Sequence, residues 1–157
     1  MRLILTCFCI ALACPAFAQD RLTVGKCLEI ANGLDQLDGY PRVIKDGEKE
    51  TTVQQQYKLG SVRYTIALNM AALKPVRESA ERARQQIIVD INGGKTVMPN
   101  SPEMVRFLAE YQKVLDKPCE VTPGHIKVSD LKLGDGPTEN AVPPSVLSVL
   151  YPILDNN

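Results

Sequence analysis

Histidine and tryptophan, which many active sites use, are scarce in this sequence. Its 157 residues include one histidine and no tryptophan. Any Ser-His-Asp or Cys-His catalysis must therefore use His125, and no Gly-x-Ser-x-Gly motif surrounds a serine. One histidine, with no cysteine cluster and no His-Glu-x-x-His motif, also excludes the familiar zinc patterns. We expect His125 to be structural or exposed to solvent, and we predict no metal and no cofactor.

An excess of charge is also missing, because 18 Lys and Arg balance 18 Asp and Glu. That balance supplies no long-range field to attract nucleic acid or an anionic membrane. Aromatic residues make up 5% of the chain, so the stacking platforms of many sugar clefts would be scarce. Spacing alone does not exclude a glycosidase-like pair of carboxylates, drawn for example from Glu29, Glu103 and Glu110. A carboxylate hydrolase therefore stays an alternative without positive support.

A nucleotide-binding loop is likewise absent. Gly94, Lys95 and Thr96 resemble the end of a phosphate-binding P-loop, but Val89 stands where that motif needs its first glycine. A P-loop also runs from a strand into a helix, whereas Pro99 follows this segment and places it in a connector. We therefore dismiss the match.

The sequence does have a three-part N-terminal segment typical of a secretory signal peptide. Arg2 supplies a positive charge, and residues 3–14 form an uncharged apolar run that is too short to span a bilayer permanently. Ala16 and Ala18 are the small residues that a signal peptidase needs, which predicts cleavage before Gln19. We therefore expect the mature chain in the periplasm or outside the cell.

Cleavage removes residues 1–18 and leaves residues 19–157, or 139 of the 157, as a single globular domain without a transmembrane segment. Two alternatives compete with this cut. Cys14 could be lipidated as in a lipoprotein, although lipoproteins usually carry Leu three residues before the cysteine and Leu12 is two before. The segment could also stay uncleaved as an N-terminal anchor.

Three of the five cysteines, Cys7, Cys9 and Cys14, belong to the predicted signal. Cys27 and Cys119 then remain as a pair in an oxidising compartment, which predicts a single disulfide between them. The bridge would close a loop of about 90 residues, for which the chain-entropy model gives about 4–5 kcal/mol of stabilisation. No Cys-x-x-Cys motif favours a redox role.

Apolar residues recur at helical spacing over residues 22–37, 62–73 and 76–91. Pro75 separates the last two segments, so either two helices meet there or one long helix kinks. Residues 87–91 are rich in β-branched side chains, and a short strand is an alternative for them.

Ser101-Pro102-Glu103 is a typical helix start and predicts a further helix to about Asp116. Residues 42–45 and 51–59 flank Asp46-Gly47 and predict a β-hairpin. The second arm is polar, and its residues 53–57 form an under-covered edge that could add a partner strand. The predicted fold is a mainly helical α+β domain with four to five helices, a small hairpin and one disulfide.

The C-terminal segment 146–154 is apolar on most sides, so it either docks into the core or is available to another protein. In the second case its contact residues would be Val146, Leu147, Leu150 and Tyr151. We predict an exported protein that binds another exported protein, as an accessory protein or inhibitor, and we favour a binding role over an enzymatic one. The alternatives are a secreted hydrolase and a lipid-anchored envelope protein attached through Cys14.

Overall fold

The computed structural model describes residues 21–47, 49–55, 57–134 and 139–156, and its architecture is mainly helical. The predicted mainly helical α+β fold is therefore confirmed. The helices of the described residues are α1 (Val24–Asp38), α2 (Val62–Asn92), α3 (Pro102–Leu115) and α4 (Pro144–Leu150), with short 3-10 turns η1 (Val128–Leu131) and η2 (Tyr151–Ile153). The predicted signal peptide, including Cys14 and Ala18, lies outside the described residues.

The strands form two small sheets. Strands β1 (Tyr40–Asp46) and β2 (Lys49–Gln55) pair as an antiparallel hairpin in which Tyr40 lies opposite Gln55. Strands β3 (Ile126–Lys127) and β4 (Leu154–Asp155) form a short parallel pair that joins the C-terminal segment to the chain after α3.

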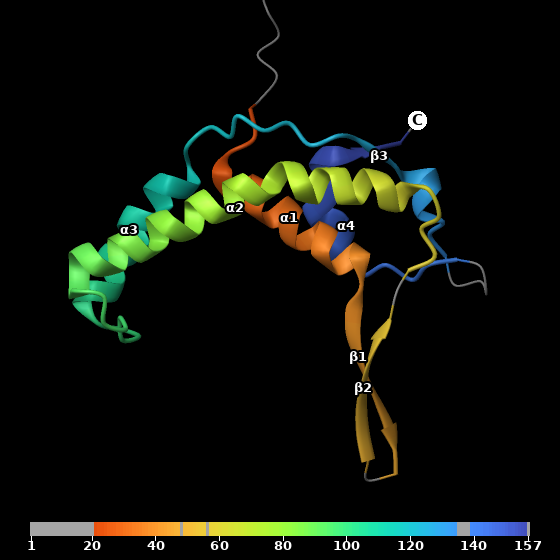
Figure 1. Cartoon of the computed structure of the whole chain (residues 1–157), viewed down its shortest axis with the longest axis horizontal. Helices are drawn as coiled ribbons and strands as arrows, with labels where there is room; N and C mark the ends of the chain where they lie inside the picture. The colour runs from red at the N-terminus through yellow and green to blue at the C-terminus, as the bar shows by residue number, and fades with distance from the viewer. Residues whose placement is uncertain (1–20, 48, 56, 135–138, 157) are drawn as a thin grey trace, which may run out of the picture.

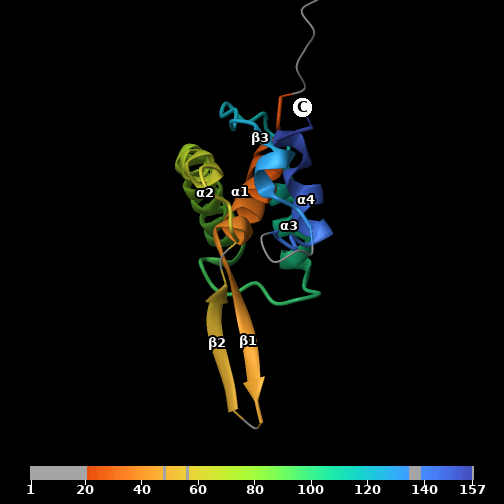
Figure 2. The same ribbon diagram turned by 90° about the vertical axis from the view of Figure 1, so that its right-hand side faces the viewer.

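The hydrophobic core surrounds α1, which lies between α2 and α4 (Figures 1 and 2). One face of α1 is buried because its apolar residues recur at helical spacing. At Gly33 a Cβ atom would come within 2.9 Å of the Leu150 side chain, so the close approach of α4 requires a glycine there. The residues that fill this core include Ile30, Leu34, Leu37, Ile66, Leu73, Ile126, Leu131, Val146, Leu150 and Ile153.

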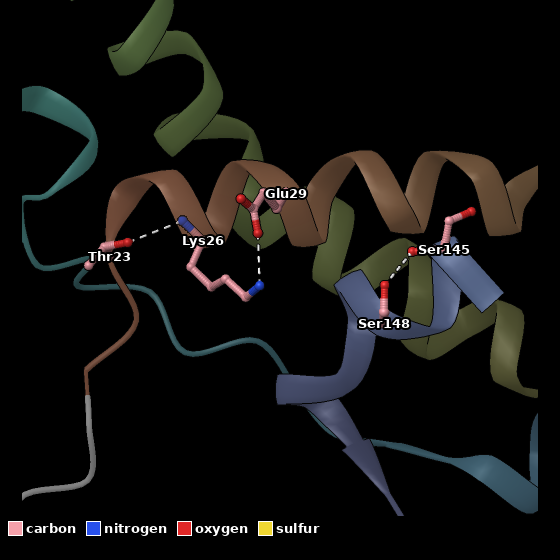
Figure 3. Close-up of polar contacts among 5 residues, drawn as sticks. All are labelled: Thr23, Lys26, Glu29, Ser145 and Ser148. Carbon is pink, nitrogen blue, oxygen red and sulfur yellow. Dashed lines mark hydrogen bonds and ion pairs between the residues drawn. The ribbon is translucent and has the colours of Figure 1, made fainter. Parts of the chain in front are cut away.

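The start of α1 is held by backbone hydrogen bonds to the segment that follows α3. The Thr23 hydroxyl caps the helix by accepting a hydrogen bond from the Lys26 amide at 3.2 Å (Figure 3). The Val24 amide donates to the Lys117 carbonyl at 2.8 Å, and the Cys119 amide donates to the Leu22 carbonyl at 2.7 Å. These backbone bonds place Cys119 beside the first turns of α1.

Helix α2 settles the alternative that Pro75 left open, because it is one continuous helix from Val62 to Asn92. A proline inside a helix removes a single backbone hydrogen bond and costs about 3 kcal/mol. Leu73 is fully buried and Val76 packs against the core, so tertiary contacts on both sides of Pro75 offset that cost. The β-branched residues 87–91 are helical, and the strand alternative is wrong for them.

Two buried asparagines hold the extended segments that connect the helices. Asn69 on α2 donates to the Gly124 carbonyl at 2.8 Å and accepts from the Gly124 amide at 2.7 Å. Asn140 accepts from the Lys58 amide at 2.7 Å and donates to the Leu131 carbonyl at 2.6 Å. Each asparagine therefore satisfies backbone groups that no strand pairs.

Candidate functional site

A two-helix arm, residues 81–115, extends from the body (Figure 1). It comprises α2 from Glu81 onwards, the connection after it and the whole of α3. Ala80 is the last buried residue of α2, and no residue of α3 is buried. Several large apolar side chains of the arm are more than half exposed or nearly so, namely Val89, Met98, Val105 and Leu108. The arm therefore presents apolar surface that the body does not cover.

The connection at the end of the arm has a defined shape. Gly93 and Gly94 have φ angles of 60° and 82°, which L-residues rarely adopt, and the Gly93 amide donates to the Val89 carbonyl at 2.8 Å. The Asn92 side chain then donates to the carbonyls of Lys95 and Thr96 at 3.4 and 3.1 Å. These bonds fold the connection back beside the end of α2.

Helix α3 begins after this connection, as its sequence predicts. The Ser101 hydroxyl accepts a hydrogen bond from the Met104 amide at 3.1 Å, and Pro102 is the first helical residue. This cap fixes the direction of the first turn of α3, which places Met104 and Phe107 opposite α2.

An open cavity of about 330 Å³ lies between the connection and the facing sides of α2 and α3. Four half-buried apolar side chains line it, from Ile88, Val97, Met104 and Phe107. Its polar lining residues are Arg84, Gln85, Lys95 and Thr96. Among the described residues, the lining therefore combines four apolar side chains with two cations, and it includes no carboxylate.

Glu81 orients the arginine at this cavity. The Nε and Nη2 atoms of Arg84 donate to the two Glu81 carboxylate oxygens at 2.9 and 3.0 Å, and Gln85 donates to Glu81 at 2.7 Å. The hydrogen bonds from Arg84 and, to a smaller extent, from Gln85 lower the pKa of Glu81 to about 2. The Phe107 ring, which lines the cavity, stacks on Tyr111 with 5.6 Å between centroids, and this contact helps to hold the ring in place.

The predicted disulfide is not confirmed, because Cys27 and Cys119 are free thiols in the structure. Both are buried, and their side chains approach to 2.8 Å, whereas a disulfide bond measures about 2.05 Å. The pKa of Cys27 is raised to about 12. Burial of the thiol is the larger cause, and its hydrogen bond and charge interaction with Cys119 are the smaller ones. Cys27 is therefore a protonated thiol at neutral pH and a poor nucleophile.

The β1–β2 hairpin forms a ribbon that projects from the body on the side away from β3 and the C-terminus (Figures 1 and 2). Each strand pairs only with the other within the described residues. Outside the ribbon, its main contacts are between β1 and α1. Strand β2 covers residues 53–55 of the predicted edge, whereas Gln56 lies outside the described residues and Tyr57 is buried in the core.

The candidate carboxylates each have a partner on their own helix. Glu29 pairs with Lys26 at 2.8 Å (Figure 3), and Glu110 pairs with Lys113 at 2.7 Å. Glu103 lies at the start of α3, where a hydrogen bond from its own backbone amide lowers the pKa of its carboxyl group. A hydrogen bond with the Ser101 hydroxyl has the same, smaller effect. The structure therefore gives these three acids capping and surface roles.

His125 is exposed, next to the Gly124 that Asn69 binds. Within the described residues, no group of three or more His, Cys, Asp or Glu side chains has the arrangement of a metal site. The same residues include no helix with the length and apolar character that crossing a membrane requires.

The C-terminal contact residues divide between core and surface. Val146 and Leu150 are buried against α1, and Leu147 packs partly against the same core. Only Tyr151 is well exposed, with 71% of its surface accessible. Three of these four side chains therefore take part in docking α4 onto α1, which is the first of the two alternatives for this segment.

Sequence reasoning dismissed residues 94–96 as a nucleotide site and proposed no other role for them. The signal that marks the cavity is the pair of glycines after an apolar helix end, followed by Lys95 and Thr96 and then by a capped amphipathic helix.

Comparison of the chain with protein-family models, with curated proteins and with solved structures gives no match.

Proposed function

We propose that the chain is an exported protein that binds an extended segment of another exported protein along the free edge of β2. Export is inferred from Arg2, the apolar run 3–14 and the small residues Ala16 and Ala18. The single observation that carries the binding role is the ribbon, whose strands project from the body and pair only with each other.

A two-stranded ribbon is marginally stable in water by itself. A third strand would satisfy the row of N–H and C=O groups that an edge exposes, which is how strand addition recognises a peptide. Strand β1 carries Pro41, which has no amide donor, whereas β2 has no proline. The β2 edge is therefore the better acceptor, and its residues 51–55 carry no charge, which favours an uncharged extended segment.

A shortened ribbon tests this role. Residues 43–52 are replaced by Asn-Gly, which keeps Arg42 opposite Val53 and closes the strands with a favoured two-residue turn. Unmodified and shortened mature chains are used as bait in an extract of the envelope fraction. We expect a specific protein to bind the first and not the second, with thermal unfolding of the body nearly unchanged.

The matched control is Gly47→Asn at the tip of the ribbon. Gly47 has a φ of 60°, which asparagine tolerates, and nothing lies within 4 Å of an added Cβ. The captured protein should remain bound to this variant, and hydrogen exchange should show protection of residues 49–55 in the complex. Capture that survives shortening, protection elsewhere, or pairing of two copies of this chain through β2 would each contradict the proposal.

We also propose that Cys27 and Cys119 form the predicted disulfide after export, by exchange with a disulfide oxidant of the oxidising compartment that is itself reduced to two thiols. Their burial and their 2.8 Å approach support it, because a small movement of the two side chains would bring the sulfurs to bonding distance. The intact mass of the exported protein should be two hydrogens lower than that of the reduced chain. Two free thiols in that protein would overturn the bridge, and a chain that starts at an acylated Cys14 would overturn the cut before Gln19.

A further inference from the structure

We propose that the cavity at the end of the arm binds a small amphiphile with one carboxylate, of the type of a medium-chain fatty acid. This site is separate from the ribbon and does not depend on the proposed partner. It lies between α2, α3 and the connection that joins them.

The dimensions and lining of the cavity suit a flexible apolar chain. Its volume of about 330 Å³ lies at the lower end of the range for small-molecule sites, about 300–1,000 Å³. Ile88, Val97 and Met104 present aliphatic surface, and the Phe107 ring is held by its stacking on Tyr111. Since these side chains are only half-buried, an apolar occupant would remove more of their surface from water.

The charges around the cavity select the head group. Among the described residues, Lys95 and Arg84 are the only charged ones that line the cavity, and Lys95 forms no ion pair with any of them. Arg84 uses Nε and Nη2 for Glu81, which holds the guanidinium at the cavity and leaves Nη1 without a protein acceptor among the described residues. A single carboxylate matches this pair, because Glu81 already neutralises part of the positive charge.

Other ligand classes match the lining less well. Inorganic phosphate would leave the four apolar side chains without an occupant, and a neutral alcohol would leave Lys95 without a counter-charge. A cation would meet Lys95 and Arg84 with no carboxylate in the lining. The lining therefore favours an apolar chain that carries one negative charge.

Isothermal titration of the mature chain tests the proposal, with decanoate below its micellar concentration and decanol below its solubility limit. We expect decanoate to bind about tenfold more tightly than decanol, which is the value of one partly exposed charge contact. Nuclear magnetic resonance should place the shifted amides at residues 94–97 and 104–107. An acetylated dipeptide with an apolar side chain and a free C-terminus is the third ligand.

Two variants separate the head-group and chain contacts. Lys95→Gln should weaken decanoate about five- to tenfold and leave decanol unchanged, because it removes only the charge. Ile88→Gln should weaken both ligands about tenfold, because it removes apolar contact. Lys74→Gln is the matched control, since Lys74 is an exposed lysine of α2 outside the cavity, and it should bind both ligands like the unmodified chain.

Circular dichroism of each variant checks that its helices are retained. Absence of decanoate binding, equal affinity for decanoate and decanol, or shifts remote from residues 94–107 would overturn the proposal. Tighter binding of the dipeptide than of decanoate would also overturn it and would assign the cavity to peptide C-termini instead.

Discussion

Helix α2 belongs to two regions that differ in how fully their apolar side chains are buried. Up to Ala80 it packs into the body, where Ile66 and Leu73 are essentially inaccessible to solvent. Beyond Ala80 it contacts mainly α3, which buries no residue of its own. One helix thus joins a region whose apolar side chains are used internally to a region whose apolar side chains remain partly available.

This contrast explains why the two proposed sites lie on the arm and the ribbon and not in the core around α1. A ligand or partner gains most where apolar surface or backbone edges are still exposed. Regions with few buried contacts also open at lower free energy than the core, which suits surfaces that adapt to a partner. Stability and recognition are therefore expected to respond to different substitutions.

The largest expected difference is between two leucine truncations. Leu34→Ala in α1 should lower the free energy of unfolding by about 3–5 kcal/mol, because Leu34 is fully buried and leaves a cavity. Leu108→Ala in α3 removes the same atoms from a side chain that is 57% exposed and should cost less than about 1 kcal/mol. Urea denaturation followed by circular dichroism measures both, and similar costs would refute the division into body and arm.

A second pair compares side-chain amides that hold backbone groups. Asn140→Ala should cost about 2 kcal/mol, because the Lys58 amide and the Leu131 carbonyl lose their partner in a buried setting. Asn92→Ala, which frees the Lys95 and Thr96 carbonyls near solvent, should change stability by less than about 0.5 kcal/mol. Denaturation of the two variants under the same conditions checks this order, which a larger loss for Asn92→Ala would reverse.

Local signals predicted much of the fold. The cap at Ser101-Pro102, the apolar spacing of α1 and the turn at Asp46-Gly47 each act within a few residues of sequence. Whether Pro75 ends a helix was not predictable, because the answer depends on the burial of Leu73 by other elements. Tertiary packing thus decided what the local pattern left open.

The asparagine clamps and the cavity were not predictable for the same reason. Asn69 binds a residue 55 positions away, and Asn140 binds one 82 positions away, whereas an isolated asparagine indicates only a turn or a surface site. The cavity forms only when the connection after Gly94 folds beside both helices. Its charged residue Lys95 therefore gave no local signal beyond a false resemblance to a P-loop.

Alkaline pH should weaken the body of the reduced protein through Cys27. The pKa of Cys27 is raised from 9.0 to about 12 in the folded state, so above pH 9 the unfolded chain loses a proton that the folded chain keeps. Stability should therefore fall between pH 9 and 12, by at most about 1.4 kcal/mol per pH unit. Denaturation of reduced Cys27→Ala, compared with the reduced parent, should show a smaller loss, and an identical pH dependence would contradict the assignment.

The smallest effect should appear in the arm at acidic pH, through Glu81. Its folded pKa of about 2 lies below its ordinary value of 4.5, so the ion pair with Arg84 contributes fully above pH 4.5 and is lost as the pH falls towards 2. Because Glu81 is exposed, its loss should affect only nearby amides, at residues 81–88, and leave global unfolding almost unchanged. Hydrogen exchange at pH 5 and pH 3 measures this local change.

Glu81→Gln should abolish that pH response, whereas Glu110→Gln, which breaks the similar surface pair with Lys113, should leave it intact. Equal responses in the two variants would show that Arg84 is not held by Glu81, and the cavity would then lose its fixed guanidinium.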